Sequence, residues 1–150
     1  MSTMTEPKTQ VYSVFIRATP EQVWDAITKP EFTLKYFYGT TFESDYAPGC
    51  PYRGFAADGS EQIEGVVIEA DPPRLLRTTW RALWADELRA EPPSRVTWEL
   101  EPAGEGVTKL TVVHDELEEA PKTAASVAGG WSLVVSGLKS VVETGEGLGL

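Results

Sequence analysis

The strongest constraint on the fold is one long helical pattern near the C-terminal end of the sequence. Its apolar residues recur at steps of three and four, which places them on one face of an amphipathic helix. These residues are Ala128, Trp131, Val134, Val135, Leu138, Val141 and Val142. Because the glycine pair at 129–130 weakens a helix, we predict a short helical piece from Pro121, followed by a longer helix that Gly145 closes.

The region between residues 39 and 115 predicts strands joined by short turns. Clusters of Gly, Pro and Asp recur there at the spacing that separates the strands of a β-meander. With one earlier strand, seven are predicted, at 10–17, 40–44, 52–57, 61–69, 75–82, 94–101 and 107–115. The alternation of apolar and polar residues at 95–101 is typical of an antiparallel sheet that faces water on one side. The first strand has apolar residues on both faces, which favours a central or covered position.

Two short helices are predicted between the first two strands. Thr19 can cap the first helix, and Pro20 suits its first position. Pro30 ends that helix because a proline disfavours helical geometry in the residue before it, and it can itself open a second helix. The predicted fold is therefore α+β, a seven-stranded curved antiparallel sheet wrapped around a long C-terminal helix, with two short helices after the first strand.

Length and charge limit the architecture and the partners. A chain of 150 residues fits one domain, predicted at 9–146 between a disordered arm at 1–8 and a tail at 147–150. The 23 acidic side chains outnumber the 13 basic ones and give a formal charge of −10, which argues against nucleic acid and anionic membranes as partners. No segment has the pattern of a signal peptide or the length of a membrane span, so no membrane insertion and a cytoplasmic location are expected.

The sequence offers little for catalysis, metal binding or cofactors. Covalent catalysis needs a nucleophile, a base and an orienting group together, and the single Cys50 and single His114 lie far apart in the chain. One imidazole without neighbouring cysteines or inward carboxylates does not make a metal site. The glycine-rich segments at 104–106 and 145–149 lack the lysine of a phosphate-binding loop. No metal and no cofactor is predicted, and enzymatic activity is left open but disfavoured.

Four segments, in order, resemble a known family. They are ATPEQVWDAITKPEF, GVVIEADPPRLLRTTW, SRVTWELEPAGEGVTKLTVVH and GGWSLVVSGLKSVVETG. They resemble blocks of the bacterial proteins related to the activator of Hsp90 ATPase, within the START-like or Bet v 1-like superfamily. The resemblance implies the helix-grip fold and a cavity, because the superfamily includes lipid carriers, hormone receptors and polyketide cyclases. The family name, taken from a co-chaperone, implies a link to the stress response.

A sheet that curls over the C-terminal helix would bring one set of side chains together between them. This set combines apolar walls with a few polar tips, which suits a small hydrophobic or aromatic ligand. The candidate ligand-binding residues are Tyr36, Phe37, Tyr52, Trp80, Trp98, Val112, His114, Trp131, Val135 and Leu138. The first three are expected at the entrance. Simple packing in the core is the competing interpretation, and it is favoured for Trp98.

Three functional hypotheses remain open. The first is non-catalytic binding of a small hydrophobic or aromatic molecule in the cavity. The second is a protein-interaction module that binds a chaperone or a repressor; a homodimer is also open, because Leu133 lies off the apolar stripe of the long helix. The third is a cyclase-like or hydrolase-like enzyme in which His114 shuttles a proton, since an unperturbed histidine titrates near neutrality.

Overall fold

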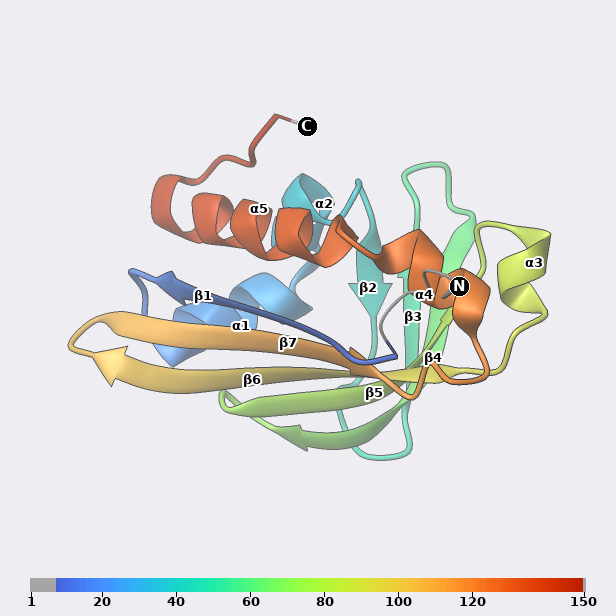
Figure 1. Cartoon of the computed structure of the whole chain (residues 1–150). Helices are drawn as coiled ribbons and strands as arrows, with labels where there is room; N and C mark the ends of the chain where they lie inside the picture. Colours follow the sequence, from blue (N-terminus) through green and yellow to red (C-terminus); the bar gives the residue numbers. More distant parts are fainter. Residues whose placement is uncertain (1–7, 150) are drawn as a thin grey trace, which may run out of the picture.

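The computed structural model describes residues 8–149 and shows one antiparallel sheet with its helices on one side (Figure 1). The strands are β1 (Gln10–Ile16), β2 (Thr41–Glu43), β3 (Pro51–Phe55), β4 (Glu61–Asp71), β5 (Leu75–Ala82), β6 (Ser94–Gly104) and β7 (Val107–Asp115). Their order in the sheet is β1-β7-β6-β5-β4-β3-β2. Strands β2 to β7 thus form the predicted meander, and β1 joins it beside β7. The predicted α+β helix-grip fold is confirmed.

The helices follow the predicted local signals. They are α1 (Pro20–Thr28), α2 (Pro30–Tyr36), α3 (Asp86–Arg89), α4 (Pro121–Val127) and α5 (Gly130–Thr144). Thr19 and Gln22 form a capping box at the start of α1. Gly129 and Gly145 flank α5 in the left-handed conformation, with φ of 79° and 86°. Helix α3 was not predicted, because four residues are too few to show a helical period.

The core lies between α5 and the inner face of the sheet. The predicted stripe of α5 is confirmed over most of its length, since Trp131, Val134, Val135, Leu138 and Val141 are all buried. Helix α2 packs against the same helix, and glycine at position 137 lets the two backbones approach closely. One end of α5 is thus covered by α1 and α2, and its other end lies near α4.

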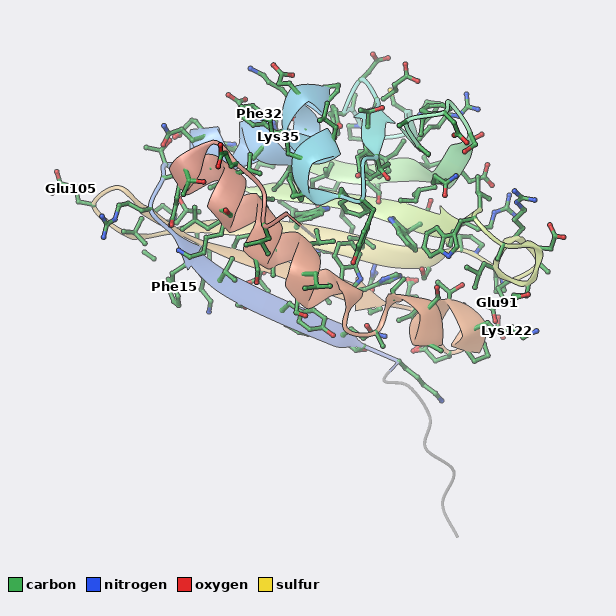
Figure 2. The ribbon with its side chains drawn as sticks, turned by 90° about the horizontal axis from the view of Figure 1, so that it is seen from above. Phe15, Phe32, Lys35, Glu91, Glu105 and Lys122 are labelled. Carbon is green, nitrogen blue, oxygen red and sulfur yellow. The ribbon has the colours of Figure 1, made fainter. Side chains whose placement is uncertain are left out.

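The expected central or covered position of the first strand is wrong, because β1 lies at the edge of the sheet. Its inward Ile16 is fully buried, whereas Val11 and Phe15 on the outer face are 56% and 57% exposed. Figure 2 shows Phe15 projecting outward from β1. Apolar residues on both faces describe the strand's two surfaces and carry no information about how many neighbouring strands it has.

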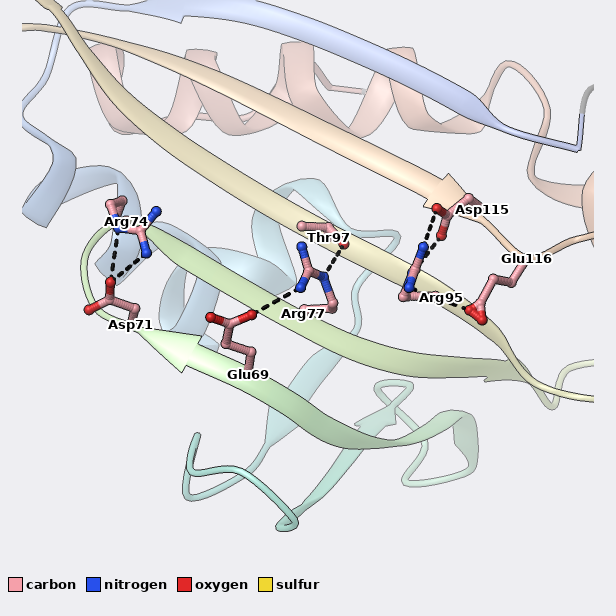
Figure 3. Close-up of polar contacts among 8 residues, drawn as sticks. All are labelled: Glu69, Asp71, Arg74, Arg77, Arg95, Thr97, Asp115 and Glu116. Carbon is pink, nitrogen blue, oxygen red and sulfur yellow. Dashed lines mark hydrogen bonds and ion pairs between the residues drawn. The ribbon is translucent and has the colours of Figure 1, made fainter.

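Besides exposed apolar side chains such as Phe15, the outer face of the sheet carries ion pairs between neighbouring strands. Arg77 lies between Glu69 and Thr97, at 2.9 and 3.2 Å, and Arg95 binds Asp115 at 2.7 Å (Figure 3). Exposed pairs of this kind each contribute about 0–1 kcal/mol. Their position leaves the inner face as the apolar side of the sheet.

Two further expectations concern the N-terminal end of the chain and its apolar helices. The predicted arm at 1–8 lies, apart from Lys8, outside the described residues. Within residues 8–149 no single helix has the length and apolar content needed to cross a bilayer; the bent pair of α4 and α5 reaches them only when counted together.

Candidate functional site

A pocket of about 450 Å³ opens at the N-terminal end of α5. Its walls come from the segment between α2 and β2, from the residue after β3, from β4, from the end of β5 and the segment after it, and from the junction of α4 with α5. Most of the lining is apolar, namely Phe37, Ala56, Ile63, Trp80, Trp84, Val127, Gly130, Trp131 and Val134. The polar lining residues are Tyr38, Thr40, Gln62 and Ser126. This volume and this lining are typical of a small-molecule site.

Trp131, in the first turn of α5, forms the floor of the pocket. Its ring centroid lies 5.8 Å from that of Phe37, 6.1 Å from Trp80 and 5.7 Å from Trp98. These edge-to-face and tilted arrangements are the preferred geometries of aromatic pairs. Trp84 stands against Trp80 and is 42% exposed at the mouth. The pocket is therefore an aromatic recess with a fixed floor and a partly exposed rim.

Another part of the rim is formed by the turn after α2. Tyr38 has a φ of 53°, a left-handed conformation that is uncommon outside glycine, and Gly39 follows it with a φ of 71°. The turn brings the Tyr38 hydroxyl 3.5 Å from the carbonyl oxygen of Gly130. The strained turn thus places an exposed tyrosine ring beside the start of α5.

A buried hydrogen-bond chain holds Trp131 from behind. Its indole N–H donates to Nδ1 of His114 at 3.0 Å, and Nε2 of His114 lies 2.7 Å from the hydroxyl of Ser94. An indole nitrogen can only donate, so Nδ1 is the acceptor and the proton of the imidazole is on Nε2. The hydroxyl of Ser94 then donates to the carbonyl oxygen of Trp80 at 3.0 Å. Every member of the chain is satisfied when His114 is neutral.

The surroundings of His114 do not suit a proton shuttle. Burial lowers its pKa from the ordinary 6.5 to about 4, and the nearby Asp115 carboxylate offsets only part of that shift. The side chain is 0% exposed and does not line the pocket. Both ring nitrogens are already engaged by Trp131 and Ser94. His114 therefore positions the floor of the pocket and does not reach a molecule inside it.

Three of the ten predicted ligand-binding residues line the pocket, namely Phe37, Trp80 and Trp131. The other seven are buried outside it: Tyr36, Tyr52, Trp98, Val112, His114, Val135 and Leu138. For two of them the reason is visible in their contacts. The Tyr36 hydroxyl donates to the carbonyl oxygen of Ala26 at 2.7 Å, and Tyr52 stacks on Phe42 at 5.0 Å. Burial raises the pKa of both tyrosines well above its usual value.

Several lining residues were missed by the sequence prediction. Trp84 follows a predicted strand directly, and a large aromatic residue in a turn was a usable signal. Gln62 and Thr40 gave no such signal, because their orientation depends on how β2, β3 and β4 pair. Ser126 and Val127 lie on α4, whose placement beside the sheet is a tertiary feature.

Helix α4 is held against the body of the protein by Glu91. This helix has no N-cap side chain of its own. The Glu91 carboxylate instead accepts hydrogen bonds from the backbone N–H groups of Lys122 and Thr123, at 2.9 and 2.7 Å, and from the Thr123 hydroxyl at 2.7 Å. Figure 2 shows Glu91 and Lys122 side by side. Partial burial raises the pKa of Glu91, but these hydrogen bonds and the Lys122 charge outweigh it and hold the pKa below its usual range.

The lining contains no ionisable group of the kind that catalysis or metal binding uses, apart from the phenol of Tyr38. Across the described part of the chain, no three His, Cys, Asp or Glu side chains lie close enough together to hold a metal ion. The geometry of the pocket allows it to enclose an apolar molecule against aromatic rings.

The family described as activator of Hsp90 ATPase homolog 1-like protein matches residues 17–143. Among solved structures, protein MLL2253 from Mesorhizobium loti is similar with a TM-score of 0.72 and 23% identity, over 90% of this chain and 96% of that one. An HSP90 activator from Plasmodium falciparum is similar with a TM-score of 0.73 and 20% identity, over 91% of this chain and 97% of that one. The Aha1 dimer from Colwellia psychrerythraea is similar with a TM-score of 0.69 and 18% identity, over 93% of this chain and 98% of that one. At these identities the likeness shows the fold. No curated protein sequence matches the chain significantly.

Proposed function

Since the chain belongs to the family of activator of Hsp90 ATPase homolog 1-like proteins, we propose that it binds a small hydrophobic or aromatic molecule without transforming it. Family and fold support a ligand-binding or regulatory domain in general. The observation that carries the finer proposal is the pocket of about 450 Å³ beside Trp131, with its apolar and aromatic lining.

The build of the pocket supports binding over catalysis. Its floor is held rigidly by the Trp131–His114–Ser94 chain, and a preformed recess lowers the entropic cost of binding. An apolar ligand gains free energy by leaving water in proportion to the apolar surface it buries. A general acid or base must lie within hydrogen-bond reach of the reacting group. His114 does not line the pocket, because it lies behind the indole of Trp131.

The proposal is tested with tryptophan fluorescence and thermal shift against a panel of lipids, flavonoids and polyketide-like aromatics. We expect members of the panel to change the emission of Trp80, Trp84 and Trp131 and to raise the melting temperature. The variant Ala56→Phe should fill the pocket and abolish both effects. Ala103→Phe is the matched control, because it makes the same change at an exposed position of β6. A panel without any response, or an equal response from both variants, would reject the proposal.

A protein-interaction role is a second candidate, favoured by the position of β1 at the edge of the sheet. An edge strand presents unpaired backbone groups that can extend onto another chain, and Val11 and Phe15 add exposed apolar surface there. One similar structure is an HSP90 activator and another is a dimer, which makes a chaperone or a second copy of this chain the partners to test. Leu133 on α5 is a further exposed apolar side chain, at 45%.

Light scattering and pull-down test this second candidate. A dimer through β1 should dissociate in Phe15→Lys, whereas Leu133→Lys should leave it intact. Capture of a chaperone by the wild type, lost in Phe15→Lys, would instead support a regulatory contact. A monomeric wild type that captures no chaperone would remove the candidate.

A further inference from the structure

The polar groups of the pocket narrow the class of ligand, and this inference rests on the proposed binding function. We propose that the pocket selects an uncharged, planar aromatic molecule whose polar edge is hydrogen-bonded by Thr40 and Gln62, and that it excludes carboxylates and phosphates.

Thr40 offers a hydroxyl that the protein leaves without a partner. The residue is only 5% exposed, and its backbone N–H is used by the carbonyl oxygen of Phe37 at 2.9 Å. Among the described residues none forms a hydrogen bond with its hydroxyl, and the oxygen is not completely buried. Thr40 lines the pocket, so its hydroxyl is available to a polar group of a bound molecule. A ligand that displaces water from this hydroxyl without replacing its hydrogen bond loses affinity, so a ligand with a polar group at this point is favoured.

Gln62 is turned toward the pocket by a bulge between β3 and β4. Phe55 is opposite Glu61 and Gly54 is opposite Ile63, so Gln62 is the extra residue with no partner on β3. In a regular strand Gln62 and Ile63 would point to opposite faces, yet both line the pocket. Bulges are a known means of redirecting a side chain at functional sites.

The amide of Gln62 is held in place and retains free hydrogen-bonding capacity. Its backbone carbonyl accepts from the N–H of Leu83 at 2.8 Å, and its Nε2 donates to the hydroxyl of Ser60 at 2.9 Å. An amide has two N–H donors and one carbonyl oxygen, so one donor and the oxygen remain without a partner among residues 8–149. With the Thr40 hydroxyl, the pocket therefore offers both donors and acceptors, which matches a phenol, a lactam or a ketone.

The charge of the pocket lining disfavours ligands that carry a carboxylate or a phosphate. No Lys or Arg lines the pocket, and the chain has a formal charge of −10. An anion that enters such a site loses its hydration without gaining a cation. The N-terminal end of α5 contributes a partial positive charge near Gly130, but a partial charge does not compensate for the desolvation of a full one. Aromatic side chains on the floor and both rims, among them Phe37, Trp80 and Trp84, favour a flat ligand through edge-to-face contacts.

Three probes with one ring system test the proposal by NMR. They are 2-naphthol, which is neutral with one hydroxyl, 2-methylnaphthalene, which has no polar group, and 2-naphthoate, which is an anion at pH 7. Binding is followed through the indole N–H signals of Trp80, Trp84 and Trp131. Trp24 on α1, which does not line the pocket, is the internal control. We expect 2-naphthol to bind at least about tenfold more tightly than 2-naphthoate, a lower bound set by the uncompensated desolvation of the anion.

Two variants separate polar recognition from simple burial. Thr40→Val and Gln62→Leu should each weaken 2-naphthol about fivefold to tenfold, the usual effect of one lost hydrogen bond, and leave 2-methylnaphthalene unchanged. Thr41→Val, one residue along and outside the lining, should change neither probe. If 2-naphthoate binds as tightly as 2-naphthol, or if both variants bind 2-naphthol as the wild type does, the proposed selectivity is wrong. The proposed binding function is not contradicted by either result. If no probe shifts any pocket signal, the proposed binding function fails as well.

Discussion

The indole N–H of Trp131 donates a hydrogen bond to Nδ1 of His114 across 3.0 Å, and this contact joins the long helix to the sheet behind the pocket. It connects α5 to β7, and through Ser94 to β6 and β5. A helix and three strands are thereby held in one polar chain at the only histidine of the sequence.

Replacing His114 by leucine should destabilise the protein by about 2–4 kcal/mol, since the buried indole N–H of Trp131 loses its acceptor and the buried Ser94 oxygen loses its donor. Urea denaturation measures the loss. Leu133→Ala on the exposed side of α5 is the control and should change the free energy of unfolding by less than about 0.5 kcal/mol. A loss in His114→Leu no larger than that of the control would contradict the role given to this contact.

Stability should fall as the pH drops from about 6.5 toward about 4, because His114 is neutral in the folded protein down to about pH 4 and protonates near pH 6.5 once unfolded. The unfolded state then binds the extra proton, so acid favours unfolding. The full effect is about 3 kcal/mol at 1.36 kcal/mol for each unit. Thermal or urea unfolding between pH 7 and 4.5 should show a flatter profile for His114→Gln than for wild type. Parallel profiles would mean that His114 is accessible to protons when folded.

Glu91→Gln should loosen α4, because the carboxamide cannot accept all three hydrogen bonds from Lys122 and Thr123. We expect a loss of about 1–2 kcal/mol, typical of a removed helix cap, and faster amide hydrogen exchange at 121–127 than elsewhere. Glu119→Gln in the exposed connection before α4 makes the same change without those partners. Unchanged exchange in Glu91→Gln would show that packing alone holds α4.

Gly65→Ala should be among the most damaging single-methyl changes on the sheet, since a Cβ there would overlap the carbonyl oxygen of Thr79 on β5. Separation of β4 from β5 at this point would cost about 2–4 kcal/mol. At Gly130 the same change meets only the Tyr38 hydroxyl at 3.4 Å and should be tolerated, because alanine favours helix α5 by up to about 1 kcal/mol. Melting curves of the two variants compare the sites. Equal stability would mean that β4 can shift to admit a methyl group.

Much of the fold was predictable because its signals are local. The strands predicted at 75–82 and 107–115 coincide with β5 and β7, since turn residues precede both strands in the sequence. The capping residue Thr19 and the two prolines placed α1 and α2, and the three-and-four spacing placed α5. The edge position of β1 was missed, because alternation describes the faces of a strand and not its neighbours.

The sequence alone determined which residues face inward, and the tertiary structure decided which inward residues line a pocket. Trp131 and Leu138 lie on the same stripe of α5, yet only Trp131 reaches the recess, because the stripe defines a direction and the packing of other segments defines where space remains. The same holds for His114, predicted inward correctly but separated from the recess by the indole it binds. Gln62 depends on a bulge in the pairing of β3 with β4. Such a position is set by contacts between distant segments, which no local pattern in the sequence records.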